Sequence, residues 1–74
     1  MISYLNMKEH TLWRKISRIV MLLANTLHIS PERALDIFYR SRTSARLHDE
    51  RYGLHLMSDQ YIVNDLIQEL QELQ

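Results

Sequence analysis

The sequence lacks the residues that build covalently linked or metal-linked scaffolds. Its 74 residues contain no cysteine, and glycine and proline occur once each. The absence of cysteine excludes both a disulfide framework and a thiolate zinc site. A single core in a chain of this size supplies only about 3–5 kcal/mol of stability. We therefore expect contact with another protein chain to contribute to the stability of this one.

Net charge and long apolar runs are also missing. Nine Lys and Arg balance nine Asp and Glu, so the field of the whole molecule does not attract nucleic acid or an anionic membrane. The longest apolar run, residues 19–24, is far shorter than the roughly 20 residues that a membrane-spanning helix needs. No charged and then apolar leader precedes it. These features predict a cytoplasmic protein without a membrane partner.

What is present is a globular composition, with 46% hydrophobic and 24% charged residues, and a helical pattern of apolar positions. The pattern predicts one all-α domain over residues 1–74, a compact bundle of three main helices and one short helix. We expect these helices at about residues 7–28, 31–41, 44–49 and 59–73.

Asn6 and Glu9 are placed to form a capping box at the start of the first helix. One arc of the first helix holds a set of apolar residues: Leu12, Trp13, Ile16, Ile19, Val20, Leu23, Ala24 and Leu27.

Ser30 and Pro31 form a strong start signal for the second helix, as N-cap and first-turn proline. Its apolar residues cover more than half of the circumference, which predicts that this helix is the centre of the core: Ala34, Leu35, Ile37, Phe38 and Tyr39. Asp36 and Arg40 stand four residues apart on the remaining face, where they can form an ion pair.

The signal is weaker in the middle of the chain. Thr43 or Ser44 could cap the short helix, and Gly53 provides the positive φ that a turn requires. Residues 54–57 alternate in a way that suits a brief extended segment, although no second strand is present to pair with it. Ser58 then caps the last helix, which has one apolar face: Ile62, Val63, Leu66, Ile67, Leu70 and Leu73.

No catalytic, cofactor-binding or metal-binding constellation stands out. The four histidines lack the spacings that place two imidazoles on one helical face: His10, His28, His48 and His55. The carboxylate pairs lie in polar surroundings, so nothing raises their pKa toward that of a general acid. No Gly-rich elbow presents a nucleophile. We therefore expect neither an enzyme nor a cofactor.

Nucleic-acid binding is an alternative because four arginines cluster around the second interhelical segment: Arg40, Arg42, Arg46 and Arg51. A small DNA-binding autoregulator could use the first three to contact phosphates. Neighbouring acidic residues dilute the cluster, and no recognition helix shows the residues expected for base readout. A solvated rim or a contact with an acidic protein accounts for these arginines equally well.

Protein binding is indicated by apolar residues that fall on polar faces. Met21 and Leu22 project from the basic side of the first helix, near Arg14 and Arg18, and Tyr61 lies on the acidic side of the last helix. Such residues are typical of an interface with another protein. Two other arrangements stay open, because the polar edges of the two helices could face each other or pair in a homodimer.

Residues 29–39, which read ISPERALDIFY, resemble a family of short helical bacterial domains of unknown function. The resemblance continues through Ser41, Gly53-Leu54 and Ser58-x-x-Tyr61-Ile62-Val63, and it covers most of residues 12–70. Members of that family are commonly encoded beside a protein with an ADP-ribosyltransferase-type fold, which implies a toxin and its neutralising partner.

The resemblance implies an antitoxin-like module that blocks its partner by steric occlusion, without active-site residues of its own. The matching residues are mainly caps and core. The chain departs from the family pattern in the charged segment from Arg46 to Arg51 and in its basic first helix. An antitoxin-like protein-binding module, with a partner encoded by the adjacent gene, is the leading hypothesis.

Overall fold

The computed structural model describes the backbone of residues 7–73 and the side chains of residues 11–73. This part of the chain contains four α-helices and two 3-10 turns: α1 (Met7–Leu27), α2 (Pro31–Arg40), α3 (Arg42–Leu47), η1 (Glu50–Tyr52), η2 (Leu54–Leu56) and α4 (Asp59–Glu72). No strand occurs between residues 7 and 73, so the predicted all-α bundle is confirmed. The capping box expected from Asn6 and Glu9 lies outside the described residues.

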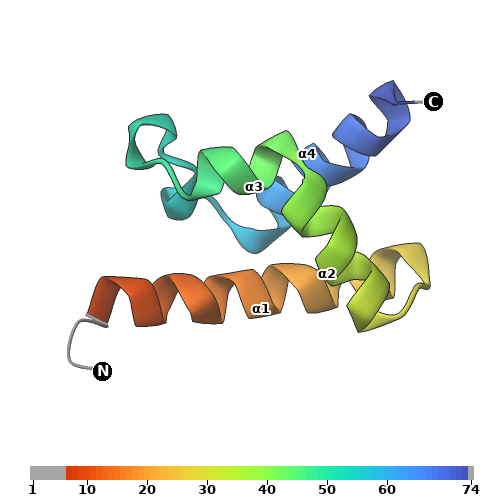
Figure 1. Ribbon diagram of the computed structural model, residues 1–74, viewed down its shortest axis with the longest axis horizontal. Coiled ribbons are helices and arrows are strands. Elements are labelled where there is room, and N and C mark those ends of the chain that lie inside the picture. The colour runs from red at the N-terminus through yellow and green to blue at the C-terminus, as the bar shows by residue number, and fades with distance from the viewer. Residues whose placement is uncertain (1–6, 74) are drawn as a thin grey trace.

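Helix α1 runs along one side of the molecule, and the other helices lie over it (Figure 1). Helix α2 crosses α1 close to its C-terminal end, and α3 with the two 3-10 turns leads back to α4. Both α2 and α4 pack directly against α1. None of the described helices is long and apolar enough to cross a membrane.

Among the side chains of residues 11–73, the core is built from twelve buried apolar ones, of which α1 contributes five. They are Ile16, Ile19, Val20, Leu23, Ala24, Ala34, Phe38, Leu47, Leu54, Ile62, Val63 and Leu66. The central helix is therefore α1, and the expectation that the second helix has this role is wrong. Only Ala34 and Phe38 of α2 are buried, one turn apart, whereas Leu35 and Tyr39 are 41% and 47% exposed because the packed elements cover only one face of α2.

Trp13 is also not in the core, although the apolar arc of the first helix includes it. Its side chain is 58% exposed. Helix α1 has 21 residues and α2 has 10, so α2 is only about half as long as α1. Because α2 crosses the C-terminal part of α1 (Figure 1), it does not cover the turn that carries Trp13.

The turn between α1 and α2 follows from local backbone chemistry. His28 adopts a left-handed conformation with φ of 56°, so it lies just after the helix and not in its last turn. The Ile29 amide donates to the Ala24 carbonyl at 3.0 Å, as in a Schellman motif. Ser30 then caps α2, since its Oγ accepts from the Arg33 amide at 3.1 Å. The predicted start of the second helix is confirmed.

Ser41 joins α2 to α3. Its amide donates to the Phe38 carbonyl at 3.1 Å at the end of α2, and its Oγ accepts from the Ser44 amide at 3.0 Å at the start of α3. The short helix therefore begins at Arg42 and ends at Leu47, not at residues 44–49 as expected. Ser41 is the cap, so Thr43 and Ser44 are residues of α3 itself. Both are buried.

The segment after α3 forms two 3-10 turns, so the brief extended segment that the alternation of residues 54–57 suits does not form. Gly53 separates the turns with φ of 70°, which confirms the predicted positive φ. The second turn, η2, begins with Leu54, whose side chain is buried in the core. Ser58 caps α4 as predicted, with its Oγ accepting from the Tyr61 amide at 3.1 Å.

Candidate functional site

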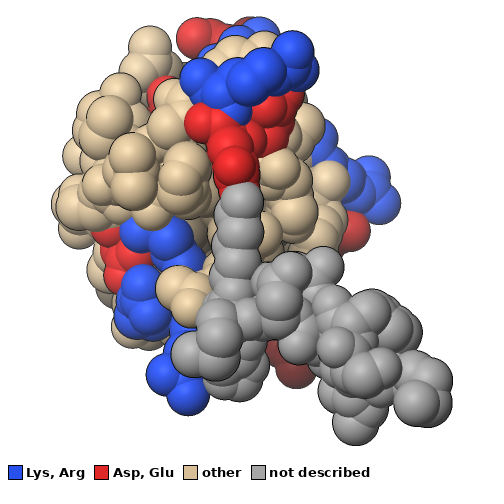
Figure 2. Space-filling view, turned by 90° about the vertical axis from the view of Figure 1, so that its left-hand side faces the viewer, with Lys and Arg blue, Asp and Glu red and all other residues tan. Residues whose placement is uncertain are grey.

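The four arginines that suggested a nucleic-acid surface each have a partner within the chain. Three of them form ion pairs with carboxylates: Arg40 with Asp36 (3.1 Å), Arg42 with Glu72 (2.6 Å) and Arg51 with Asp49 (2.6 Å). Arg46 instead lies over the Tyr52 ring, 5.7 Å from its centroid. Figure 2 shows acidic side chains lying beside basic ones on the face that it draws, with no broad basic area between them. The arginines are close in sequence, but three of the four are paired with carboxylates, so they do not act as one unpaired positive cluster.

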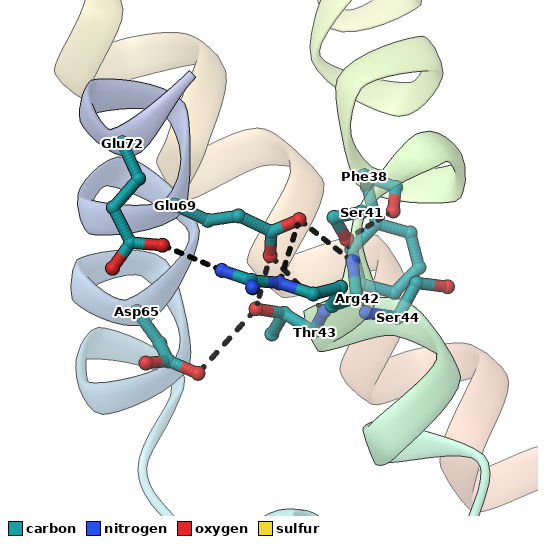
Figure 3. Close-up of polar contacts among 8 residues, drawn as sticks. All are labelled: Phe38, Ser41, Arg42, Thr43, Ser44, Asp65, Glu69 and Glu72. Atoms are coloured by element: carbon teal, nitrogen blue, oxygen red, sulfur yellow. Dashed lines mark hydrogen bonds and ion pairs between the residues drawn. The ribbon is translucent and has the colours of Figure 1, made fainter. Parts of the chain in front are cut away.

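Glu69 of α4 holds the N-terminus of α3 (Figure 3). Its carboxylate accepts hydrogen bonds from the Arg42 amide at 2.8 Å and from the Thr43 amide at 3.2 Å. Ser41 accepts from the next amide, that of Ser44. The first three amides of α3 have no partner within the helix, and these two side chains bind all of them. A carboxylate from a distant helix thus acts as a helix cap.

Further contacts keep the Glu69 carboxylate ionised. The Thr43 hydroxyl lies 3.0 Å from Glu69 Oε1 and 3.4 Å from Asp65 Oδ2, and the Arg42 Nε lies 3.7 Å from Glu69 Oε2. Burial is the largest single effect on Glu69 and raises its pKa, but the hydrogen bonds from Arg42 and Thr43 together with the Arg42 charge lower its pKa below the ordinary value. The hydrogen bond and charge of Glu72 in turn raise the pKa of Arg42.

A polar cleft of about 320 Å³ lies between α3 and α4. It is lined by Arg42, Thr43, Arg46, Asp65, Gln68, Glu69 and Glu72. A general acid that works near neutral pH needs a carboxyl group with a raised pKa, whereas the pKa of Glu69 is lowered. The side chains that line the cleft connect α3 to α4, since Arg42 pairs with Glu72 and Thr43 donates to Glu69. Within residues 11–73, no three His, Asp or Glu side chains form a group that could hold a metal ion.

The basic side of α1 meets the start of α4 through Asp59. Its carboxylate accepts from Arg18 Nε at 2.8 Å and from Lys15 Nζ at 3.1 Å. Lys15 also donates to the Met57 carbonyl at 2.7 Å. The hydrogen bond from Arg18 is the main cause of the lowered pKa of Asp59, and Lys15 adds to the effect. The polar edges of α1 and α4 thus face each other here, one of the arrangements that the sequence left open.

The residues expected at a protein interface fall into different environments. Met21 is 47% exposed and Tyr61 is 52% exposed, whereas Leu22 is half-buried and packs against the core. Leu22 follows Arg18 by four residues, so it lies on the side of α1 that turns toward α4. Arg14 is exposed and has no ion-pair or hydrogen-bond partner among the side chains that the structure describes.

Met21 and Tyr61 do not share a surface. On α1, Met21 lies about 160° around the helix from the buried Ile19 and Leu23, since each residue turns the helix by about 100°. On α4, Tyr61 precedes Asp65 by one turn, on the face that borders the polar cleft. The two exposed side chains therefore belong to separate candidate surfaces, and only Met21 lies beside Arg14.

Several contacting residues escaped the sequence-based expectations. Glu69 was expected on a solvated face and Asp59 only in the cap of the last helix, although their carboxylates contact α3 and α1. No local signal identifies Glu69, because Arg42 and Thr43 lie 27 and 26 residues away. For Asp59, the unequal distribution of charge between the basic start and the acidic end of the chain is the available hint.

Comparisons with protein-family models, with curated proteins and with solved structures give no match for this chain.

Proposed function

We propose that this protein is a binding module for another protein. The observation that carries the proposal is the large apolar area outside the core. Nine bulky apolar side chains in the described part of the chain are at least 41% exposed: Trp13, Met21, Leu35, Tyr39, Tyr52, Leu56, Met57, Tyr61 and Leu73. Single exposed hydrophobic residues are common on monomeric proteins. Nine beside a core of twelve among the described residues favour burial of a part of this apolar surface against a partner.

The proposed mode of action is steric. A module without a catalytic group acts on its partner by covering a binding site or by holding mobile loops. The resemblance to the bacterial family suggests the partner, an ADP-ribosyltransferase-fold protein encoded by the adjacent gene. The protein would then be antitoxin-like, and its occupation of the toxin surface would exclude nucleotide or target.

Pairing within the arginine cluster is the reason to prefer a protein over DNA. A phosphate that approaches Arg40 or Arg42 meets the carboxylate of Asp36 or Glu72 at the same place. Breaking each pair to reach the phosphate would leave a negative charge beside it, which costs free energy. A protein surface with its own mixed charges does not require the pairs to break.

Co-expression tests the proposal. The adjacent gene product is produced with an affinity tag, with and without this protein, and both cell growth and the purified material are examined. We expect the two proteins to co-purify in a fixed ratio and growth to recover when both are present. The proposal fails if they elute separately and the small protein does not relieve toxicity. A gel shift with the protein's own promoter DNA at two salt concentrations tests the autoregulator alternative in parallel.

A further inference from the structure

The face of α1 that points away from the core forms a continuous exposed strip. Five exposed residues form this strip, and we call them the outer strip: Arg14, Ser17, Arg18, Met21 and Asn25. They recur at spacings of three and four residues, so they lie along one side of the helix. Met21 is the only large apolar side chain among them. The outer strip is therefore a row of polar groups with an apolar side chain near its centre.

The charge of this strip is of one sign. Residues 11–27 contain Arg14, Lys15 and Arg18 but no Asp or Glu. Lys15 is bound to Asp59 and to the Met57 carbonyl, and its side chain is only 12% exposed. The Arg18 side chain is 57% exposed despite its bond to Asp59. Arg14 has no partner at all among the described side chains.

We propose that the outer strip is the docking surface for an acidic region of the partner protein. In this arrangement carboxylates of the partner pair with Arg14 and with the exposed side of Arg18, and an apolar pocket between them receives Met21. Methionine suits such a pocket because its flexible thioether adapts to irregular shapes. This inference rests on the proposed function, and it adds the location of the interface and the charge of the partner.

Two other occupants of the strip fit less well. A second copy that docks strip to strip brings Arg14 and Arg18 of both chains together with no carboxylate on either strip, and like charges oppose that contact. A nucleic acid would gain from Arg14 and from the exposed side of Arg18, but its phosphates offer no apolar pocket for Met21. An acidic protein surface with an apolar pocket uses both the charge and the methionine.

The test measures binding of the adjacent gene product by titration calorimetry, with variants in matched pairs. Arg14→Glu is compared with Arg33→Glu, an exposed cation on α2 that has no ion pair among the described side chains. Met21→Asp is compared with Leu35→Asp, since the two side chains are 47% and 41% exposed. We expect each α1 variant to weaken binding by about tenfold or more and each α2 control by less than about twofold. Circular dichroism should show native helix content in all four.

Salt adds a second readout. The Kd of the wild-type complex should rise with ionic strength, and Arg14→Gln should reduce that dependence, because a carboxylate of the partner then loses its counter-charge. Equal losses for Arg14→Glu and Arg33→Glu, or a Kd that does not change with salt, would overturn the inference. So would a loss of binding in Tyr61→Asp with none in Met21→Asp, because the interface would then lie on α4.

The outcomes separate this inference from the proposed function. If the wild-type proteins do not bind, the proposed function fails and the inference falls with it. If they bind and the α1 variants behave like their controls, the proposed function stands and the inference is wrong. Sedimentation of the protein alone tests whether a second copy occupies the strip. If the wild-type protein is a dimer and Met21→Asp converts it to monomers, the strip serves self-association and the proposal is overturned.

Discussion

Helices α1, α2 and α4 pack together through apolar side chains, whereas α3 adds to its one apolar core residue, Leu47, a polar attachment to α4 through the Glu69 carboxylate. In the first region, Ile19, Leu23, Phe38 and Ile62 are completely buried. In the second, Glu69 binds two amides and a hydroxyl of α3 while its side chain stays 12% exposed. Apolar burial is non-directional and depends mainly on area. The carboxylate contact depends on donors placed at hydrogen-bond distance.

The difference predicts how each region tolerates change. A core side chain can be replaced by another of similar volume at a small cost, since packing can adjust. Replacement of Glu69 removes the acceptor of the Arg42 and Thr43 amides at once. The α3 attachment should therefore be the more specific of the two and the core the larger source of stability.

Removal of the central aromatic ring should have the largest effect. Phe38→Ala deletes a completely buried ring at the contact of α2 with the core, and such changes cost about 3–5 kcal/mol. That is comparable with everything a core of this size supplies, so we expect the variant to lose most of its helical signal at 25 °C in circular dichroism. Leu35→Ala, on the exposed side of the same helix, is the control and should unfold close to wild type in urea. A free energy of unfolding for Phe38→Ala that lies within about 1 kcal/mol of the wild-type value would contradict the assignment of the core.

Loss of the Glu69 cap should come next. We expect Glu69→Ala to lower the free energy of unfolding by about 2 kcal/mol, because it leaves two α3 amides without acceptors. Hydrogen exchange should show faster exchange at the Arg42 and Thr43 amides, with the amides of α1 changed much less. Glu72→Ala, one turn further along α4, removes only a contact to the exposed Arg42 guanidinium and is the matched control. Equal effects of the two substitutions would show that the carboxylate does not cap α3.

The apolar face of α1 and the caps at Ser30 and Ser58 could be predicted from the sequence because their causes are local. The helical period places Ile16, Ile19 and Leu23 on one face of α1. Ser30 before Pro31 is a local signal for the start of a helix, and α2 begins there. The centre of the bundle was mispredicted because periodicity reports which face is apolar and not whether another helix covers it. Leu35 and Tyr39 fit the apolar pattern, but no described element packs over them.

The contacts of the candidate sites depend on pairings that no local pattern specifies. Arg42 appeared to belong to a basic cluster because its sequence neighbours are basic, but its partners Glu69 and Glu72 are separated from it by a helix and two turns. Met21 was identified correctly as a side chain outside the core, because a single residue on the wrong face of a helix is a local signal. Leu22 gave the same signal, and only the position of α4 shows that it is half-buried.

Acid should weaken the α3 attachment and the α1–α4 contact before it affects the apolar core. Glu69 and Asp59 have a lower pKa in the folded protein than in the unfolded chain. Their contribution is complete above the unfolded values of about 4.3 and 3.9 and is lost as the pH falls through the folded pKa of each group. We expect the urea midpoint to decrease below about pH 5. Glu69→Gln should make this decrease smaller, whereas Gln68→Glu, at an exposed neighbouring position, should not.

The ion pair of Asp36 and Arg40 gives the smallest expected effect and tests whether charge pairing alone stabilises the fold. Both side chains are on α2, four residues apart, and they are 60% and 80% exposed. Exposed pairs with this spacing contribute about 0.3–0.5 kcal/mol, because water and salt screen them. Arg40→Ala should therefore change the urea midpoint barely above experimental error, and added salt should remove the difference. A loss as large as that of Glu69→Ala would mean that an exposed surface ion pair stabilises the fold as much as the capping of the α3 amides does. The same variant bears on the arginine cluster, because Arg40→Ala should leave binding of the protein to the adjacent gene product unchanged if the outer strip of α1 is the interface.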